Sequence, residues 1–372
     1  MRRKPLTALL ACACALALGV TAGCSVNGTL HLPTGVVYPS IKPTAGTPDQ
    51  TVTHTFNFEG KQRSLTVNVN GPLLAGARTA EKSVIRFGRA RENDWIKDYY
   101  PAFIFEDNQE PFFTALIGQL REIRDSEGLD ADRYVELMTT FAQSIEYRTD
   151  PGDLSPKFPV ETFADRNGDC DDKTLLLGGL LAREGYDVAI LLFGPEQHVA
   201  LGIKANALAY RDTGYAFIET TTQGFVGMAP ESVGDGTVLK SVPQVFPLEG
   251  GTTAFGAADQ VAEIEKAAAD VEARVTALAA EIKSADTRLK QLEAEVRNLK
   301  SRMDSLMSAG DNAGYNALVP KYNAAAAAFN DGVASRNDIV AKHNAAVQTH
   351  TYIREHLDDR RGTFEYLRTR AL

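Results

Sequence analysis

The spacing of apolar residues changes along the chain, and each spacing predicts a different element. Over 52–69, apolar and polar residues alternate on both sides of a turn at 59–61, which indicates a β-hairpin with one buried face. Apolar residues then recur every three or four positions over 111–123 and over 130–147, which is typical of amphipathic helices. We therefore expect a hairpin followed by two helices.

The central part of the chain combines a helical pattern with strand patterns. Apolar residues at helical spacing over 175–181 precede a continuous apolar run at 188–193, which is typical of a buried strand. Two further short strands are expected at 198–203 and 215–218. A helix followed by antiparallel strands predicts an α+β domain, which we place at 51–250.

The last third of the chain has the pattern of a coiled coil. Alternating three- and four-residue spacing through seven heptads predicts one helix about 70 Å long. Its apolar positions are Val261, Ile264, Ala268, Val271, Val275, Leu278, Ile282, Ala285, Leu289, Leu292, Val296, Leu299, Met303 and Leu306. Residues 308–314 interrupt the pattern, and a second, Ala-rich helix with Pro320 near its start follows. We expect an antiparallel helical hairpin at 257–357, separate from the preceding domain. A parallel dimer through the first helix is the alternative.

The N-terminus has the features of an export signal. A basic start leads into an apolar run at 6–20 and then into small residues at 21–23. The ending Thr21-Ala22-Gly23-Cys24 resembles a bacterial lipobox, although that motif usually has Leu in the place of Thr21. The resemblance implies that 1–23 form a lipoprotein signal peptide and that Cys24 is the lipidated first residue of the mature chain.

The segment after Cys24 is rich in Pro and Gly and lacks periodicity, so 24–50 is predicted to be a flexible tether. We therefore expect an exported protein whose lipid anchors it to the extracytoplasmic face of a bacterial membrane. An ordinary cleaved signal and an uncleaved membrane helix are the alternatives.

Composition and charge narrow the class of protein. With 44% hydrophobic and 23% charged residues, the chain matches folded globular proteins. The formal net charge of −9 argues against a nucleic-acid partner. Because Cys12, Cys14 and Cys24 lie in or at the end of the signal, Cys170 is the single internal thiol, which excludes an intrachain disulfide framework.

Cys170 is the first candidate for chemistry. It directly precedes the apolar helical run, so we expect it at a helix N-terminus, where the exposed N–H groups stabilise a thiolate. The neighbouring Asp169, Asp171 and Asp172 oppose this effect by raising the pKa of the thiol. A basic partner is therefore needed for a low-pKa nucleophile.

His198 and Glu219 are the candidate partners of Cys170. His198 begins a predicted strand, and an adjacent antiparallel strand would present its imidazole to the thiol. Glu219 ends the next predicted strand, where its carboxylate would orient the imidazole. Cys170, His198 and Glu219 are thus predicted to act as nucleophile, base and orienting acid.

Metal sites receive less support. Asp165, Asn167 and Asp169 imitate the start of an EF-hand, but Cys170 replaces its glycine and Leu176 replaces its final glutamate. A zinc site built on the predicted thiol and imidazole lacks further ligands. We therefore expect no cofactor.

Four motifs in order carry a family resemblance. They are the segments at 158–162 (FPVET), 168–172 (GDCDD), 185–188 (GYDV) and 198–202 (HVALG). Together they resemble the core of the transglutaminase-like superfamily, particularly its prokaryotic exported members, and the similarity covers about 108–226.

The resemblance implies a papain-like α+β core whose Cys begins a helix and whose His and Asp lie on adjacent strands. Cys170 and His198 match the family's nucleophile and base. Glu219 stands where the family more often has Asp, which is one methylene shorter. No residue here can be assigned as the family's side-chain oxyanion donor, so the backbone N–H of Cys170 is the donor we name.

The function expected from these features is that of a membrane-anchored thiol enzyme. Cys170 would attack amide bonds of peptides or proteins, including cell-wall peptide, and form an acyl-enzyme. Hydrolysis is favoured over amide exchange because water is abundant. The alternative is a non-catalytic lipoprotein scaffold that binds a peptide or cell-wall strand and uses its coiled coil as a partner-binding arm.

Overall fold

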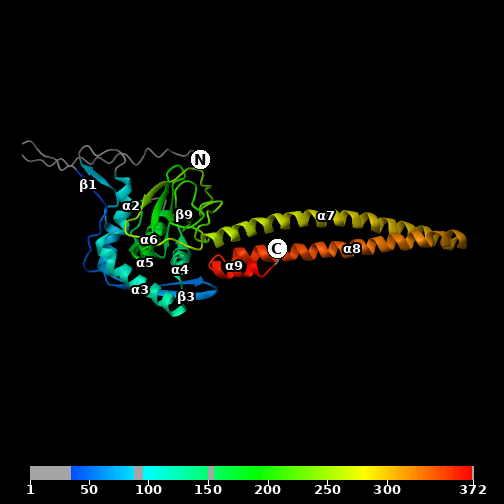
Figure 1. The fold of residues 1–372 in the computed structure, drawn as a ribbon, viewed down its shortest axis with the longest axis horizontal. Helices are drawn as coiled ribbons and strands as arrows, with labels where there is room; N and C mark the ends of the chain where they lie inside the picture. The colour runs from blue at the N-terminus through cyan, green and yellow to red at the C-terminus, as the bar shows by residue number, and fades with distance from the viewer. Residues whose placement is uncertain (1–34, 88–94, 150–154, 371–372) are drawn as a thin grey trace, which may run out of the picture.

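Two parts of different shape make up the chain, an α+β body and a long helical hairpin that projects from it (Figure 1). The computed structural model describes residues 35–87, 95–149 and 155–370. The predicted signal peptide and Cys24 lie outside the described residues. Among the helices that are described, none has both the length and the apolar character needed to cross a membrane.

A four-stranded antiparallel sheet forms one layer of the body. Its order is β10 (Gln244–Pro247), β7 (Val188–Phe193), β8 (His198–Ile203) and β9 (Ala216–Ile218). Nearly every side chain of the two central strands is buried, which explains their continuous apolar runs. The three strands predicted from the sequence are confirmed, whereas β10 was not predicted.

Helix α6 (Cys170–Arg183) lies at the centre of the body and packs on β8. All residues from Asp172 to Ala182 are buried, because other helices cover the side of α6 that faces away from the sheet. These helices are α2 (Ile96–Ile104), α3 (Glu110–Glu127), α4 (Ala131–Ser144) and α5 (Pro159–Asp165). The first residue of α6 is therefore fixed by packing on several sides.

The predicted β-hairpin forms from β2 (Gln50–Phe58) and β3 (Lys61–Val69), with Glu59 and Gly60 at positive φ in the turn. Every second side chain is buried against α3 and α4. The remaining elements are short: β1 (Gly35–Val37), α1 (Gly71–Thr79), β4 (Ile85–Phe87), the 3-10 turn η2 (Asp107–Gln109), β5 (Glu146–Tyr147) and β6 (Asn167–Gly168).

The prediction of a flexible tether at 24–50 is wrong for its C-terminal part. Ile41 is 3% exposed, its N–H donates to Glu106 Oε1 at 3.1 Å and its carbonyl accepts from Asn108 Nδ2 at 3.1 Å. Asp49 accepts a hydrogen bond from the N–H of Gly71 at 2.8 Å. One buried side chain and satisfied backbone groups fix this segment, although its composition is that of a linker.

The two long helices are α7 (Ala258–Ser308) and α8 (Asn312–Glu355), which run antiparallel and pack along their length. Small residues on α8 allow close approach; a Cβ added at Gly332 would lie 3.0 Å from Leu289 Cδ2. Arg336 Nε and Asp286 Oδ1 form an ion pair across the helices at 3.0 Å. The α+β class and the pairing of two long helices are confirmed.

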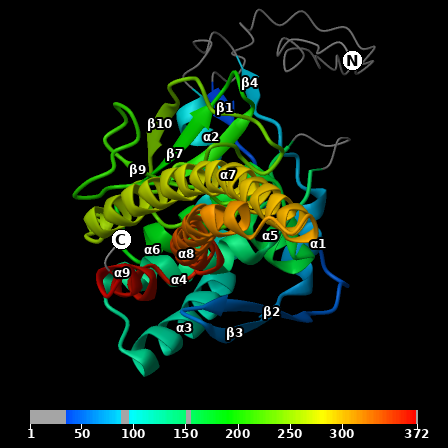
Figure 2. The same ribbon diagram turned by 90° about the vertical axis from the view of Figure 1, so that its right-hand side faces the viewer.

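Two details of the hairpin differ from expectation. Pro320 lies inside α8, eight residues after its first residue, so one carbonyl in the preceding turn lacks its helical N–H partner. The hairpin is also not separate from the body, because Val261, Ile264 and Ile353 belong to the main hydrophobic core. A further helix, α9 (Arg360–Arg368), packs beside this base (Figures 1 and 2).

Candidate active site

The first turn of α6 presents Cys170, and two aspartates hold that turn in place. Asp169 is the N-cap and its Oδ1 accepts from the N–H of Asp172 at 3.4 Å. In return, Asp172 Oδ2 accepts from the N–H of Asp169 at 3.3 Å. This reciprocal capping box satisfies helix-start donors that would otherwise lack partners. Two of the three acidic neighbours of the thiol therefore have a structural role.

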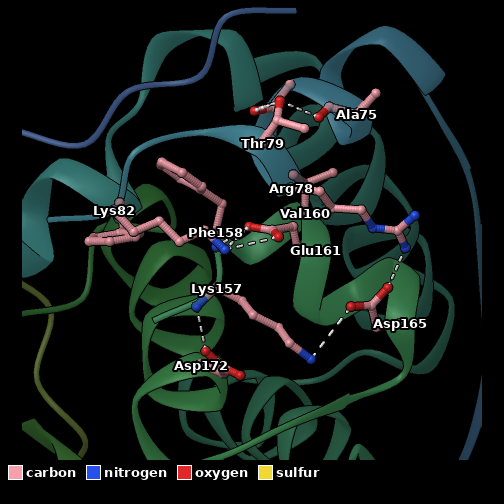
Figure 3. A network of polar contacts seen from close by, with 12 residues as sticks. Ala75, Arg78, Thr79, Lys82, Lys157, Phe158, Val160, Glu161, Asp165 and Asp172 are labelled. Atoms are coloured by element: carbon pink, nitrogen blue, oxygen red, sulfur yellow. Dashed lines mark hydrogen bonds and ion pairs between the residues drawn. The ribbon is translucent and has the colours of Figure 1, made fainter. Parts of the chain in front are cut away.

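Asp172 also ties the start of α6 to the loop before α5. Its Oδ1 accepts from the N–H of Lys157 at 2.6 Å, and Lys157 Nζ lies 3.5 Å from Asp165 Oδ2 (Figure 3). Burial and the nearby charge of Asp169 raise the pKa of Asp172 to about 7. The backbone N–H groups of Lys157 and Asp169, which donate to this carboxylate, and the charge of Lys157 act to lower the pKa.

This raised pKa predicts how stability depends on pH. Between pH 4 and pH 7 the folded chain binds a proton at Asp172 that the unfolded chain has lost, so this group makes the free energy of unfolding fall as pH rises. Asp172→Asn should flatten that slope by on the order of 2 kcal/mol across the window. Urea unfolding at pH 4.5 and 7 measures the effect. Asp212→Asn, at an exposed turn, is the control, and identical slopes for the wild type and the Asp172 variant would contradict the prediction.

His198 and Glu219 meet in the buried interior, as the sequence predicts for neighbouring strand ends. Both are 3% exposed, and His198 Nε2 lies 3.2 Å from Glu219 Oε2. Glu219 Oε1 accepts from the N–H of Thr220 at 3.0 Å and from the N–H and hydroxyl of Thr221 at 2.6 and 2.5 Å. Burial alone would raise the pKa of Glu219, but His198 and the Thr221 donors outweigh it and lower the pKa.

The register of the sheet explains how the first turns of α6 come to lie against β8, the strand that begins with His198. Pairing of β8 with β9 ends at Leu201 and Ile218, so Val199 extends past the ladder. Helix α6 bonds to its backbone instead, because Thr174 Oγ1 donates to the carbonyl of Val199 at 3.2 Å, and the N–H of Val199 acts to lower the pKa of the Cys170 thiol. Cys170 and Thr174 are one turn apart and share this face of the helix.

The expectation of a stabilised Cys170 thiolate is wrong for this structure. Burial, followed by the charges of Asp171 and Asp169, raises the pKa of the thiol well above its ordinary value, and the N–H of Val199 only partly offsets this. In the described part of the chain, no hydrogen bond joins the sulfur to His198. The resting thiol is therefore protonated at neutral pH, and it needs a base at the moment of reaction.

Sequence reasoning missed two buried polar residues near Glu219, namely Lys173 and Gln143. Lys173 is fully buried, and its Nζ donates to the carbonyls of Gln143 at 3.2 Å and Ile145 at 2.6 Å. Burial lowers the pKa of Lys173 to about 8, while the charge of Glu219 acts to raise it. The sequence does contain a signal for them, because Lys173 and Gln143 each stand within a helical pattern of apolar residues.

Two tyrosines lie in the electrostatic surroundings of the thiol. Burial, followed by nearby ionisable acids that include Cys170 and Asp169, raises the pKa of Tyr100 and of Tyr147. Both hydroxyls therefore stay protonated across the physiological range and can donate hydrogen bonds.

The potential metal ligands near the site come from one helical turn. Asp169, Cys170 and Asp171 place one ligand atom each within 4.8 Å of one another, and His198 is not part of this group. Among the described residues, this group does not combine with His198 into a zinc site.

No protein-family model matches this chain, and no curated protein or solved structure shows a significant match to it.

Proposed function

We propose that this chain is an exported thiol enzyme with a transglutaminase-like, papain-like core, which acts on amide bonds of peptides or proteins. One observation carries the proposal: the central helix that Cys170 begins packs on β8, the strand that begins with His198, and His198 forms a buried pair with Glu219. A nucleophile at a helix start, followed by a base and an acid on neighbouring strand ends, is the arrangement that acyl transfer requires.

The proposed reaction starts from a protonated thiol. Because Glu219 engages Nε2 of His198, Nδ1 is the ring nitrogen left to take the proton from Cys170. The sulfur then attacks the amide carbonyl, a C–S bond forms, and the N–H of Cys170 stabilises the oxyanion. The imidazolium returns the proton to the leaving amine as the C–N bond breaks. Water then cleaves the acyl-enzyme, with amide exchange as the outcome if an amine arrives first.

The replacement of the family's usual Asp by Glu219 fits this role. Glu219 lies one residue past β9, and its longer side chain still reaches His198 at 3.2 Å. Donors from Thr220 and Thr221 hold its second oxygen, so the extra methylene does not leave the carboxylate free to rotate.

The proposed location is the outer face of a bacterial membrane, with Cys24 as the lipidated residue. This part of the proposal rests on the sequence of residues 1–24. Cell-wall peptide is a substrate class that such a location would offer, and the hairpin would extend far beyond the body as an arm for a partner.

The test is covalent labelling of the chain from residue 25 onward with a peptide that carries a vinyl sulfone in place of the scissile amide. We expect a single adduct at Cys170, found by mass spectrometry, and none in Cys170→Ala. If denaturing the wild-type protein did not reduce labelling, Cys170 would be an ordinary thiol, and the proposal would be overturned.

The second candidate is the non-catalytic scaffold. The raised pKa of Cys170, together with the lack of a described hydrogen bond to His198, favours it. In that case the wild type and a His198 variant would label at equal rates, while the chain would still bind peptide.

A further inference from the structure

Gln143, in the last turn of α4, is bonded to the segment that carries the acid. Its Nε2 donates to the carbonyl of Glu219 at 2.8 Å and to the carbonyl of Gly224 at 3.0 Å. Its Oε1 accepts from the N–H of Gly224 at 3.4 Å. One buried amide therefore closes the segment 219–224 at both ends and uses both of its donor protons.

This closed segment supplies the groups that hold the Glu219 carboxylate. Thr220 and Thr221 lie inside it, and their N–H groups donate to Glu219 Oε1. Because β9 ends at Ile218, the sheet ladder fixes none of these residues. The position of the carboxylate relative to His198 thus depends on bonds from outside the sheet. Besides those of Gln143, Thr220 Oγ1 lies 3.2 Å from Thr174 Oγ1, and Thr221 Oγ1 accepts from the N–H of Gly234 at 2.9 Å.

Gln143 is in turn fixed by the helix that carries the thiol. Lys173 Nζ donates to the backbone carbonyl of Gln143, and Lys173 lies one turn after Cys170 on α6. The chain of contacts runs from Cys170 along α6 to Lys173, then to Gln143, and then to Glu219. It sets the nucleophile and the acid relative to each other without touching reacting atoms.

We infer that Gln143 is a positioning residue for Glu219, held in place by Lys173; this inference rests on the proposed function. Without the amide, the segment 219–224 loses the bonds at both ends, so the carboxylate is held toward His198 less firmly. The imidazole then takes and returns the thiol proton less efficiently.

The test is a double-mutant cycle with Gln143→Met, which keeps the side-chain length but removes the amide. We expect labelling by the vinyl sulfone peptide at pH 7 to fall about tenfold in Gln143→Met. In a Glu219→Gln background the same change should cost less than about twofold, because the acid is already lost. The acid limb of the pH–rate profile should also move to lower pH in Gln143→Met, because a displaced carboxylate stabilises imidazolium less.

Met138→Ala is the matched control, because it creates a cavity at a fully buried apolar position on the same helix. It should lower stability without moving the pH–rate profile. A loss in Gln143→Met that is equally large with and without Glu219→Gln would reveal a merely structural role and overturn the inference.

Hydrogen exchange provides a measurement that needs neither activity nor a folded variant. In the wild-type chain, the amides of Thr221 and Gly224 should exchange as slowly as those of α6. Exchange at the rate of exposed turns would overturn the inference while leaving the proposed function intact. Wild-type labelling that does not depend on His198 would instead overturn the proposed function, and with it the positioning role.

Discussion

Replacing His198 by alanine is expected to slow labelling of Cys170 by the vinyl sulfone peptide at least about 100-fold at pH 7, which corresponds to ~2.7 kcal/mol. The reason is the raised pKa of the thiol: burial and two aspartates keep the proton on sulfur, so attack requires a base. The difference from the wild type should shrink as pH rises, because hydroxide then removes the proton without His198. Second-order labelling rates between pH 6 and pH 10 measure both effects.

His54→Ala is the control for loss of a buried histidine in the same domain. Its Nε2 lies 2.8 Å from the carbonyl of Phe163, and its ring packs against Phe141 and Phe163, so its loss should lower stability and leave the labelling rate of the folded protein unchanged. Equal rates for the wild type and His198→Ala at every pH would favour the scaffold and rule out His198 as the base.

The elements around the site could be predicted because each has a strong local pattern. The apolar run of β7, the helical spacing of α6 and the heptads of α7 each reflect which faces are buried. Their order also indicated that His198 and Glu219 would end up on neighbouring strand ends, and these two side chains do meet.

The electrostatics of the site could not be predicted in the same way. A helix start favours a thiolate, but burial of Cys170 opposes it, and burial depends on how the surrounding elements pack. The aspartates looked like free charges in the sequence, whereas Asp169 and Asp172 cap the helix. Lys173 was hidden for a similar reason, since its carbonyl partners lie about 30 residues earlier in the chain.

The second large expected effect concerns Arg360, which lies at the base of the hairpin. Arg360 on α9 is 5% exposed; its Nε bonds to Glu136 Oε1, its Nη2 lies 3.3 Å from Glu136 Oε2, and its Nη1 bonds to Gln260. Arg360→Leu should lower the free energy of unfolding by about 3–5 kcal/mol, because it leaves a buried carboxylate without its counter-charge. Urea unfolding followed by circular dichroism measures this loss.

The pH dependence of that loss follows from Glu136. Burial raises its pKa to about 7, with Arg360 acting to lower it. Without the arginine the pKa rises further, so the folded variant prefers the protonated acid and loses stability as pH increases from about 5 to 8. The penalty of Arg360→Leu should therefore be larger at pH 8 than at pH 5, and Glu136→Gln in the same chain should recover part of it.

Arg336→Leu provides the matched control, because its partner Asp286 is 44% exposed in the middle of the hairpin and such pairs contribute under about 1 kcal/mol. If Arg360→Leu lowered the free energy of unfolding as little as Arg336→Leu, the hairpin would be only loosely joined to the body. A large loss would mean that α9 fixes the hairpin to α4, the helix that also carries Gln143. A partner that pulled on the hairpin would then act on the same helix that holds Glu219.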